Sequence, residues 1–214
     1  MKNLFFLLLL AATAPAIGQH KLSIDDKGRA LKDFYRGMQV ETLWLSGQHV
    51  DWESGEPDRP GAEQDIHTHC SAFVASACKR LNTYILRPPE HKTLLLANAQ
   101  FDWLASPEAR NNGWAPIGGA NIYEEAQRLA NQGFIVVATY KNPDAKVPGH
   151  IALVTPHALT PEKIAESGPM LTMAGTHNWN LISLKAGFKS HIAEWPEHAI
   201  LFYYNIHPPA IATR

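Results

Sequence analysis

Hydrophobic residues recur with a helical period in the first half of the chain. In the segment 71–81, SAFVASACKRL, apolar side chains return every four positions, as at Phe73, Ala77 and Leu81. This spacing places them on one face of a helix with 3.6 residues per turn. The pattern therefore predicts a helix over this segment, with Cys70 at its start.

The second half of the chain carries one more helical pattern, over 121–131, which Gly133 is well placed to end. After it come runs rich in β-branched and aromatic residues, which are typical of strands. The turn sequence KNPDAKVPG separates the first two runs and predicts a hairpin. We therefore expect an α+β domain with helices packed on an antiparallel sheet. The predicted strands cover 134–140, a run from His150 onward, 170–175 and 199–206.

Length and composition limit the class of protein. The chain has 214 residues, 45% of them hydrophobic and 18% charged, which suits one soluble domain with a substantial core. Lys and Arg number 19 against 20 Asp and Glu, a net charge of -1, and they form no basic run. Binding to nucleic acid relies on clustered cations, so we expect no nucleic-acid partner.

The first residues have the pattern of an export signal. Lys2 precedes an apolar run at 4–12, and small residues follow it before Gln19. We expect a signal peptide over 1–18 and a secreted or periplasmic mature chain. The alternative is an uncleaved N-terminal anchor. The apolar run is shorter than the roughly 20 residues that cross a bilayer, and no longer run follows, so the mature chain is expected to have no transmembrane segment.

The two cysteines, Cys70 and Cys78, are expected to stay unpaired. Eight residues of helix rise about 12 Å, whereas a disulfide needs alpha carbons roughly 4.4 to 6.8 Å apart. Cys78 lies on an apolar stripe and is interpreted as a small buried hydrophobe. Cys70 lies at a helix N-terminus, which favours an anion and can turn a thiol into a nucleophilic thiolate. The alternative is a Cys buried in the first turn.

Three short motifs follow one another in the predicted elements: HCSAFVASA at a helix start, PGHIALV at a strand start 80 positions later, and THNW. Over about 66–206 the chain resembles the papain-like amidase group, which includes the cysteine- and histidine-dependent amidohydrolase/peptidases (CHAP) and the NlpC-type cell-wall endopeptidases. The resemblance implies Cys70 as nucleophile, His150 as base and Asn178 as the residue that orients the imidazole. His177 is the alternative to Asn178.

The same resemblance implies the reaction. A thiolate attacks an amide carbonyl, a thioester forms, and water releases the acid product without a cofactor. Backbone N–H of Cys70 and the side-chain amide of Gln64 would stabilise the oxyanion, although Gln64 is equally well explained as a solvated loop residue. The expected substrate is a peptide, in particular the peptide part of peptidoglycan.

Two other functions remain open. His67 and His69 flank Thr68 directly before Cys70, so two imidazoles and a thiolate could bind zinc or copper, with a further ligand from His150 or His177. The second alternative is a non-catalytic protein that binds the cell wall on the same fold.

The chain is divided accordingly. An N-terminal extension over 19–65 is expected to pack on the catalytic domain because it is rich in Trp, Leu and Val. The domain itself spans 66–207, and 208–214 form a tail. Within the extension, Trp44 and Trp52 are candidates for the wall of a substrate cleft.

Overall fold

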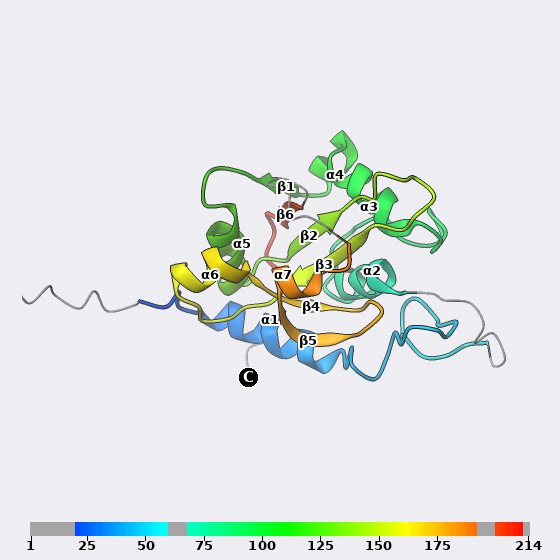
Figure 1. Ribbon diagram of the computed structural model, residues 1–214, viewed down its shortest axis with the longest axis horizontal. Coiled ribbons are helices and arrows are strands. Elements are labelled where there is room, and N and C mark those ends of the chain that lie inside the picture. Colours follow the sequence, from blue (N-terminus) through cyan, green and yellow to red (C-terminus); the bar gives the residue numbers. More distant parts are fainter. Residues whose placement is uncertain (1–19, 60–67, 192–199, 212–214) are drawn as a thin grey trace, which may run out of the picture.

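The computed structural model describes residues 20–59, 68–191 and 200–211. They form a six-stranded antiparallel sheet with helices on both faces, which confirms the α+β class (Figure 1). Strands β1 and β5 were not predicted from the sequence. The helices are α1 (Asp26–Gly37), α2 (Cys70–Arg80), α3 (Leu96–Leu104), α4 (Pro107–Asn111), α5 (Ile122–Asn131), α6 (Pro161–Ser167) and α7 (Leu184–Gly187). The strands are β1 (Trp114–Ile117), β2 (Val136–Tyr140), β3 (His150–Val154), β4 (Met170–Met173), β5 (Trp179–Ser183) and β6 (Leu201–Asn205).

The strands lie in the order β1-β6-β2-β3-β4-β5, and every neighbouring pair is antiparallel. Strands β2 and β3 form the predicted hairpin, with Tyr140 opposite His150. Strand β4 pairs with β3 only at Leu153 and Val154. The first residues of β3 therefore have a neighbouring strand on one side only.

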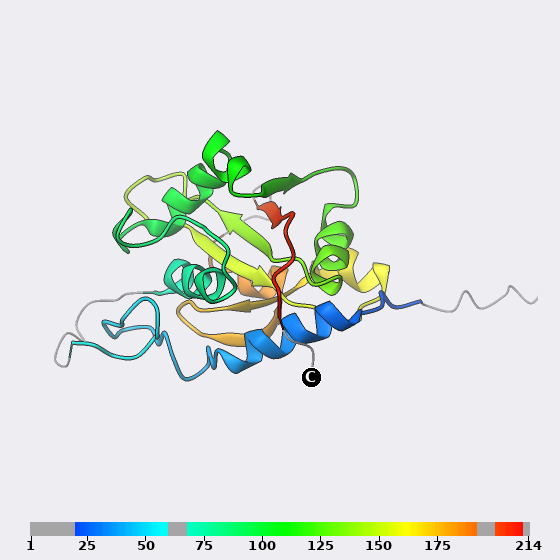
Figure 2. The ribbon, with the colours of Figure 1, turned by 180° about the vertical axis from the view of Figure 1, so that it is seen from behind.

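Side chains of β3 alternate between two core clusters, one on each face of the sheet. Ile151 and Leu153 join the cluster that contains the buried residues of α2, which we call the α2 face. Ala152 and Val154 join the cluster that contains those of α5 and α7, which we call the α5 face. Figure 2 shows the molecule from behind, with α2 and α3 beside the strands. The two faces matter because the candidate site residues are divided between them.

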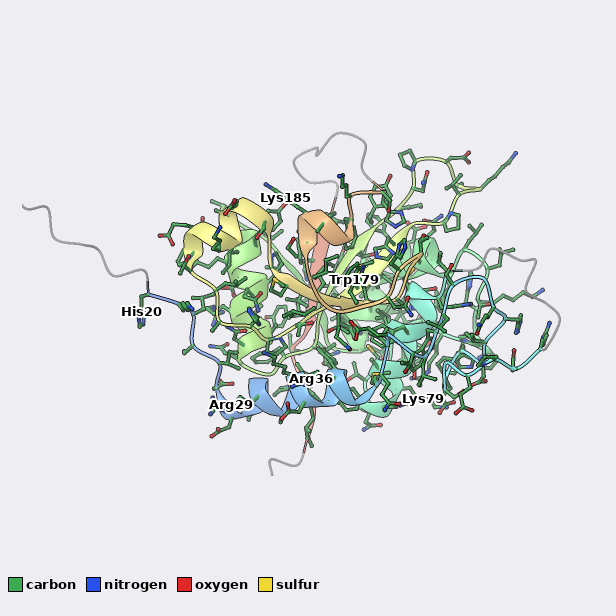
Figure 3. The ribbon with its side chains drawn as sticks, turned by 60° about the horizontal axis from the view of Figure 1, so that its bottom comes forward. His20, Arg29, Arg36, Lys79, Trp179 and Lys185 are labelled. Atoms are coloured by element: carbon green, nitrogen blue, oxygen red, sulfur yellow. The ribbon has the colours of Figure 1, made fainter. Side chains whose placement is uncertain are left out.

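The N-terminal segment contributes to the core of the α2 face. Helix α1 buries Leu31 and Tyr35 there and exposes Arg29 and Arg36 on its outer side (Figure 3). An amphipathic helix of this kind is stabilised mainly by the apolar face that it buries. Residues 20–59 thus share one core with the helix that carries the candidate nucleophile.

Trp44 is a core residue, so its prediction as a cleft residue is wrong. Its side chain is fully buried, and its ring centroid lies 5.3 Å from that of Phe73 in an edge-to-face contact. The indole Nε1–H donates to the carbonyl oxygen of Trp52 at 3.1 Å, which satisfies the polar end of the buried ring. Trp52 itself is half-buried and borders the candidate site.

The sequence predicts a signal peptide at the N-terminus and a tail at the C-terminus. The expected signal peptide, 1–18, lies outside the described residues. In the described ranges, no helix combines the length and apolar character that a bilayer crossing requires. From the expected tail the structure describes 208–211, in which Ile211 packs against the core of the α2 face.

Candidate active site around Cys70

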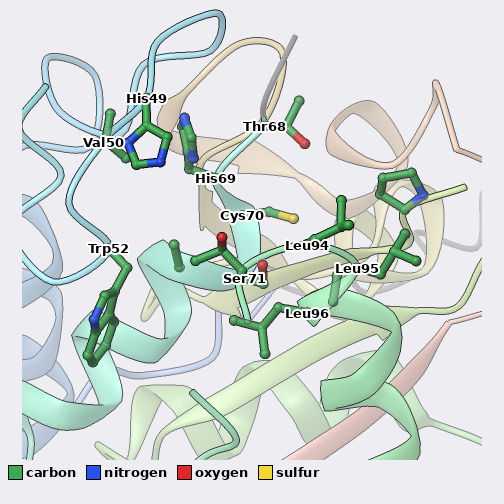
Figure 4. A pocket seen from close by; sticks show the side chains of 14 residues that line it. His49, Val50, Trp52, Thr68, His69, Cys70, Ser71, Leu94, Leu95 and Leu96 are labelled. Carbon is green, nitrogen blue, oxygen red and sulfur yellow. The ribbon is translucent and has the colours of Figure 1, made fainter. Parts of the chain in front are cut away.

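A cavity of about 290 Å³ lies at the N-terminus of α2, with Cys70 in its wall (Figure 4). Its other walls come from three residues of the N-terminal segment, from 68–72 around the start of α2, from the loop and first turn of α3 at 93–97, and from Pro148 before β3. The three N-terminal residues are His49, Val50 and Trp52. Ligand pockets commonly begin at about this volume. The structure thus places the candidate nucleophile in a pocket rather than in the closed interior.

Cys70 is a free thiol and is only 3% exposed. Burial raises its pKa above the ordinary thiol value, while the backbone N–H groups of Ile151, Ser71 and Cys70 itself act in the opposite direction. The sequence-based expectation of a lowered pKa is therefore wrong for this conformation. The cost of desolvating a thiolate outweighs the stabilisation from the helix N-terminus.

Cys78 is also free, so the prediction that the two cysteines stay unpaired is confirmed. Its side chain is fully buried in the core of the α2 face, as expected for a small hydrophobe. Burial raises the pKa of this thiol to about 12. Cys78 therefore stays protonated at neutral pH and serves packing.

His150, the candidate base, lies against the α5 face. Its ring stacks on that of His191, with centroids 4.5 Å apart, and meets Phe188 edge-on at 4.7 Å. The side chain is 1% exposed, and its Nε2 atom has no hydrogen-bond partner within the described ranges. Burial, followed by the charge of His191, holds its pKa well below the usual histidine value. An imidazole in this position does not line the cavity of Cys70.

The structure therefore brings the backbone at the start of β3 to the sulfur but keeps the imidazole away from it. The N–H of Ile151 acts on the thiol of Cys70, and His150 is the preceding residue. Adjacent strand residues point to opposite faces of a sheet. His150 and Ile151 are thus neighbours along the backbone, but only Ile151 faces the side of the sheet on which Cys70 lies.

Asn178 does not orient His150, which corrects the role inferred for it. Its Nδ2 group donates to the carbonyl oxygens of Val40, Leu43 and Trp44 at 2.7 to 3.1 Å, and its Oδ1 accepts from the N–H of Gly175 at 2.9 Å. These bonds tie the loop before β5 to the segment that follows α1.

The other predicted site residues divide into two groups. His177, the alternative to Asn178, is exposed and does not line the cavity. Gln64 and His67 lie outside the described residues, so the oxyanion role of Gln64 stays a prediction.

The metal alternative depends partly on the same undescribed segment. Among residues 20–59, 68–191 and 200–211, no three His, Cys, Asp or Glu side chains form a group that could hold a metal ion. Nε2 of His69 lies 2.8 Å from the carbonyl oxygen of Gln48. Because a carbonyl oxygen only accepts, this nitrogen carries the proton and has no lone pair for a metal. The proposed cluster with His67 and Cys70 stays a prediction.

The structure adds wall residues that sequence reasoning missed. His49 borders the cavity, and its Nδ1 is hydrogen-bonded to the carboxylate of Asp58. Leu94 and Leu95 form another part of the wall. In the structure α3 begins only at Leu96. No periodic signal in the sequence distinguishes these pocket residues from core residues.

The fold and site define an α+β protein with a buried free thiol in a small cavity at a helix N-terminus. No protein-family model matches the chain, and a search of curated proteins finds no match either.

Proposed function

We propose that this chain is an exported cysteine-dependent hydrolase of amide bonds, with Cys70 as nucleophile and His150 as general base. The observation that carries the proposal is the surroundings of the sulfur. A free thiol lies in a cavity wall at the start of an 11-residue helix, and three backbone N–H groups act on it. These groups stabilise a thiolate once a base has removed the proton.

The proposed reaction follows from this arrangement. His150 accepts the thiol proton, and the thiolate attacks the substrate carbonyl to form a C–S bond. The tetrahedral oxyanion collapses with cleavage of the C–N bond, and the imidazolium protonates the departing amine. Water, deprotonated by the same imidazole, then hydrolyses the thioester and releases the acid. The N–H groups near the sulfur are candidates for oxyanion donors.

The proposal requires the ring of His150 to turn from His191 toward Cys70 when substrate is bound. Two features support this movement. The residue begins β3 before the strand pairs with β4, so β4 does not hold this part of β3 by ladder hydrogen bonds. Its Nε2 atom is buried without a partner, a state that costs about 1 to 3 kcal/mol. A hydrogen bond to the thiol would remove this cost.

The papain-like fold and the cell-wall substrate belong to the same proposal. The fold is supported by the order of the motifs, with a Cys at a helix start and a His at a strand start on an antiparallel sheet. Peptidoglycan as substrate and export to the periplasm or medium rest on the resemblance and on the N-terminal sequence alone.

The test is digestion of purified sacculi and of peptide amides by the full chain. We expect Cys70→Ala and His150→Ala to lose at least about 1000-fold in turnover while remaining folded, and Cys78→Ala to retain it. Equal losses for Cys70→Ala and Cys78→Ala would disprove the assignment. Activity that EDTA removes and zinc restores would favour the metal site instead. Binding to sacculi without released fragments in mass spectra would favour the non-catalytic alternative.

A further inference from the structure

The walls of the Cys70 cavity are mainly apolar. Within the described part of the chain, no Asp, Glu, Lys or Arg side chain lines it. Its polar side chains carry two imidazoles, one indole, three hydroxyls and the thiol. A continuous apolar part of the wall consists of Leu94, Leu95, Leu96 and Ala97, and Pro148 adds to it. A site that recognised a carboxylate or an ammonium group of its substrate would place an opposite charge in this wall.

The mouth of the cavity exposes aliphatic side chains. Leu94 is 70% exposed, the largest exposed fraction among the large hydrophobic side chains that the structure describes as exposed. Val147 is 42% exposed and directly precedes Pro148. The amide of Asn98 donates to the carbonyl oxygen of Val147 at 2.9 Å and so fixes this loop to α3. An exposed leucine thus belongs to the cavity wall, and a second exposed aliphatic side chain directly precedes the wall residue Pro148.

Leu95 adds a backbone feature at this mouth. Its φ angle is +56°, in the left-handed region that bulky residues rarely adopt. Such strain is typical of functional positions, where the surrounding structure imposes it. The left-handed conformation of Leu95 ends the loop before α3, and Leu94, Leu95 and Leu96 all line the cavity.

We infer that this cavity binds an uncharged aliphatic group on the acyl side of the substrate carbonyl. The inference rests on the proposed function and names its substrate class. Figure 4 shows the sulfur of Cys70 turned toward Leu94 and Leu95. After attack, the acyl carbon is bonded to that sulfur, so the part of the substrate next to the leucines is the part that stays on the enzyme. The group is an acyl chain or the aliphatic side chain of a peptide.

The test compares p-nitrophenyl octanoate with p-nitrophenyl acetate. The thiolate forms a C–S bond, the C–O bond breaks, and p-nitrophenolate leaves; water then hydrolyses the thioester. Each buried methylene contributes about fourfold. Burial of about three to four of the methylenes that octanoate has beyond acetate should therefore raise kcat/KM on the order of 100-fold. Leu94→Asp should lower the octanoate-to-acetate ratio at least about tenfold.

The matched control is Leu181→Asp, which changes an exposed leucine on β5 (39% exposed) away from the cavity and should leave the ratio unchanged. Equal kcat/KM for the two esters, or equal ratios for the two variants, would overturn the inference. A third ester, of N-acetyl-leucine, identifies the source. Faster turnover of this ester than of octanoate assigns the cavity to a peptide side chain, and slower turnover assigns it to an acyl chain.

Failure of the proposed function gives a different result. If Cys70 is not the nucleophile, mass spectra show no acyl adduct on it, and Cys70→Ala hydrolyses both esters as fast as the wild type. The cavity is then tested by calorimetry with octanamide, which is uncharged, and Cys70→Ala. Binding that Leu94→Asp weakens and Leu181→Asp does not still supports an aliphatic site, whereas absence of binding refutes it.

Discussion

The imidazole of His150 lies face to face with that of His191, with ring centroids 4.5 Å apart and planes only 13° from parallel. Phe188 closes the edge of the His150 ring, and Tyr140 approaches His191 at 6.3 Å. Among the residues that the structure describes, no carboxylate contributes to the lowered pKa of either imidazole. The stack is therefore compatible with two neutral rings, and a proton on either one would introduce an unpaired buried charge.

Folding stability should consequently fall in mild acid. The pKa of His150 is well below the usual value in the folded state, so below about pH 6.5 the unfolded chain binds a proton that the folded chain does not. The contribution of His150 to the free energy of unfolding is therefore fully present above about pH 6.5. It decreases by up to about 1.4 kcal/mol per pH unit as the pH falls toward the folded-state pKa. Urea midpoints at pH 7.5 and 5.5 measure this slope, and His150→Phe should flatten it.

The control for this experiment is His177→Gln, which changes an exposed histidine near β5. It should leave the slope as in the wild type. If His150→Phe and wild type lose the same stability between the two pH values, His150 is not held neutral by burial.

Asn178→Ala should reduce stability by about 1 to 3 kcal/mol and leave turnover per folded molecule close to that of the wild type. The variant loses the donors that bind the carbonyls of Val40, Leu43 and Trp44, and buried acceptors without partners account for the cost. Chemical denaturation measures the first effect and kcat the second.

Asn180→Ala is a matched control, because Asn180 joins β5 to the same segment through Glu41 at an exposed site. We expect a change within about 0.5 kcal/mol. A large loss of kcat in Asn178→Ala, with stability unchanged, would restore its role as an orienting residue.

The sequence predicted helices α2 and α5 and the strands β2, β3, β4 and β6, but not which face of the sheet each side chain occupies. Helix α2 and the hairpin of β2 and β3 were predictable because their residues repeat with clear periods. In β3, however, all five residues are buried, so the alternation that normally marks a core face is absent. Nothing in HIALV therefore indicates that His150 faces α7 and that Ile151 faces α2.

Two further errors have the same origin in tertiary packing. Strand β5 was missed because Trp179 and Leu181 are exposed apolar residues, which obscures the usual separation of apolar and polar sides. The bonds of Asn178 reach residues more than 130 positions away, and no local spacing encodes such contacts.

Alkylation of the substrate-free protein reports on the thiol of Cys70. Because burial raises its pKa, the rate with iodoacetamide should reach half of its maximum above about pH 8.5. His150→Ala should not change this profile, since the stacked ring does not serve the thiol in this state. The measurement is peptide mapping by mass spectrometry between pH 6 and 10. A plateau already near pH 6 would show a thiolate paired with imidazolium in the resting protein.

Cys78 provides the last test, because it separates a packing role from a chemical one within the same helix. The side chain is fully buried in the core of the α2 face, so Cys78→Ala removes one sulfur atom's contacts and should cost about 1 kcal/mol. Cys78→Ser has nearly the native size but buries a hydroxyl, which is more costly to desolvate than a thiol. The Ser variant should therefore lose about 1 to 3 kcal/mol more stability than the Ala variant. Both variants should retain kcat and the alkylation profile of Cys70. Equal stability of the Ala and Ser variants in urea would show that the surroundings of Cys78 are polar or open to water, contrary to the structure.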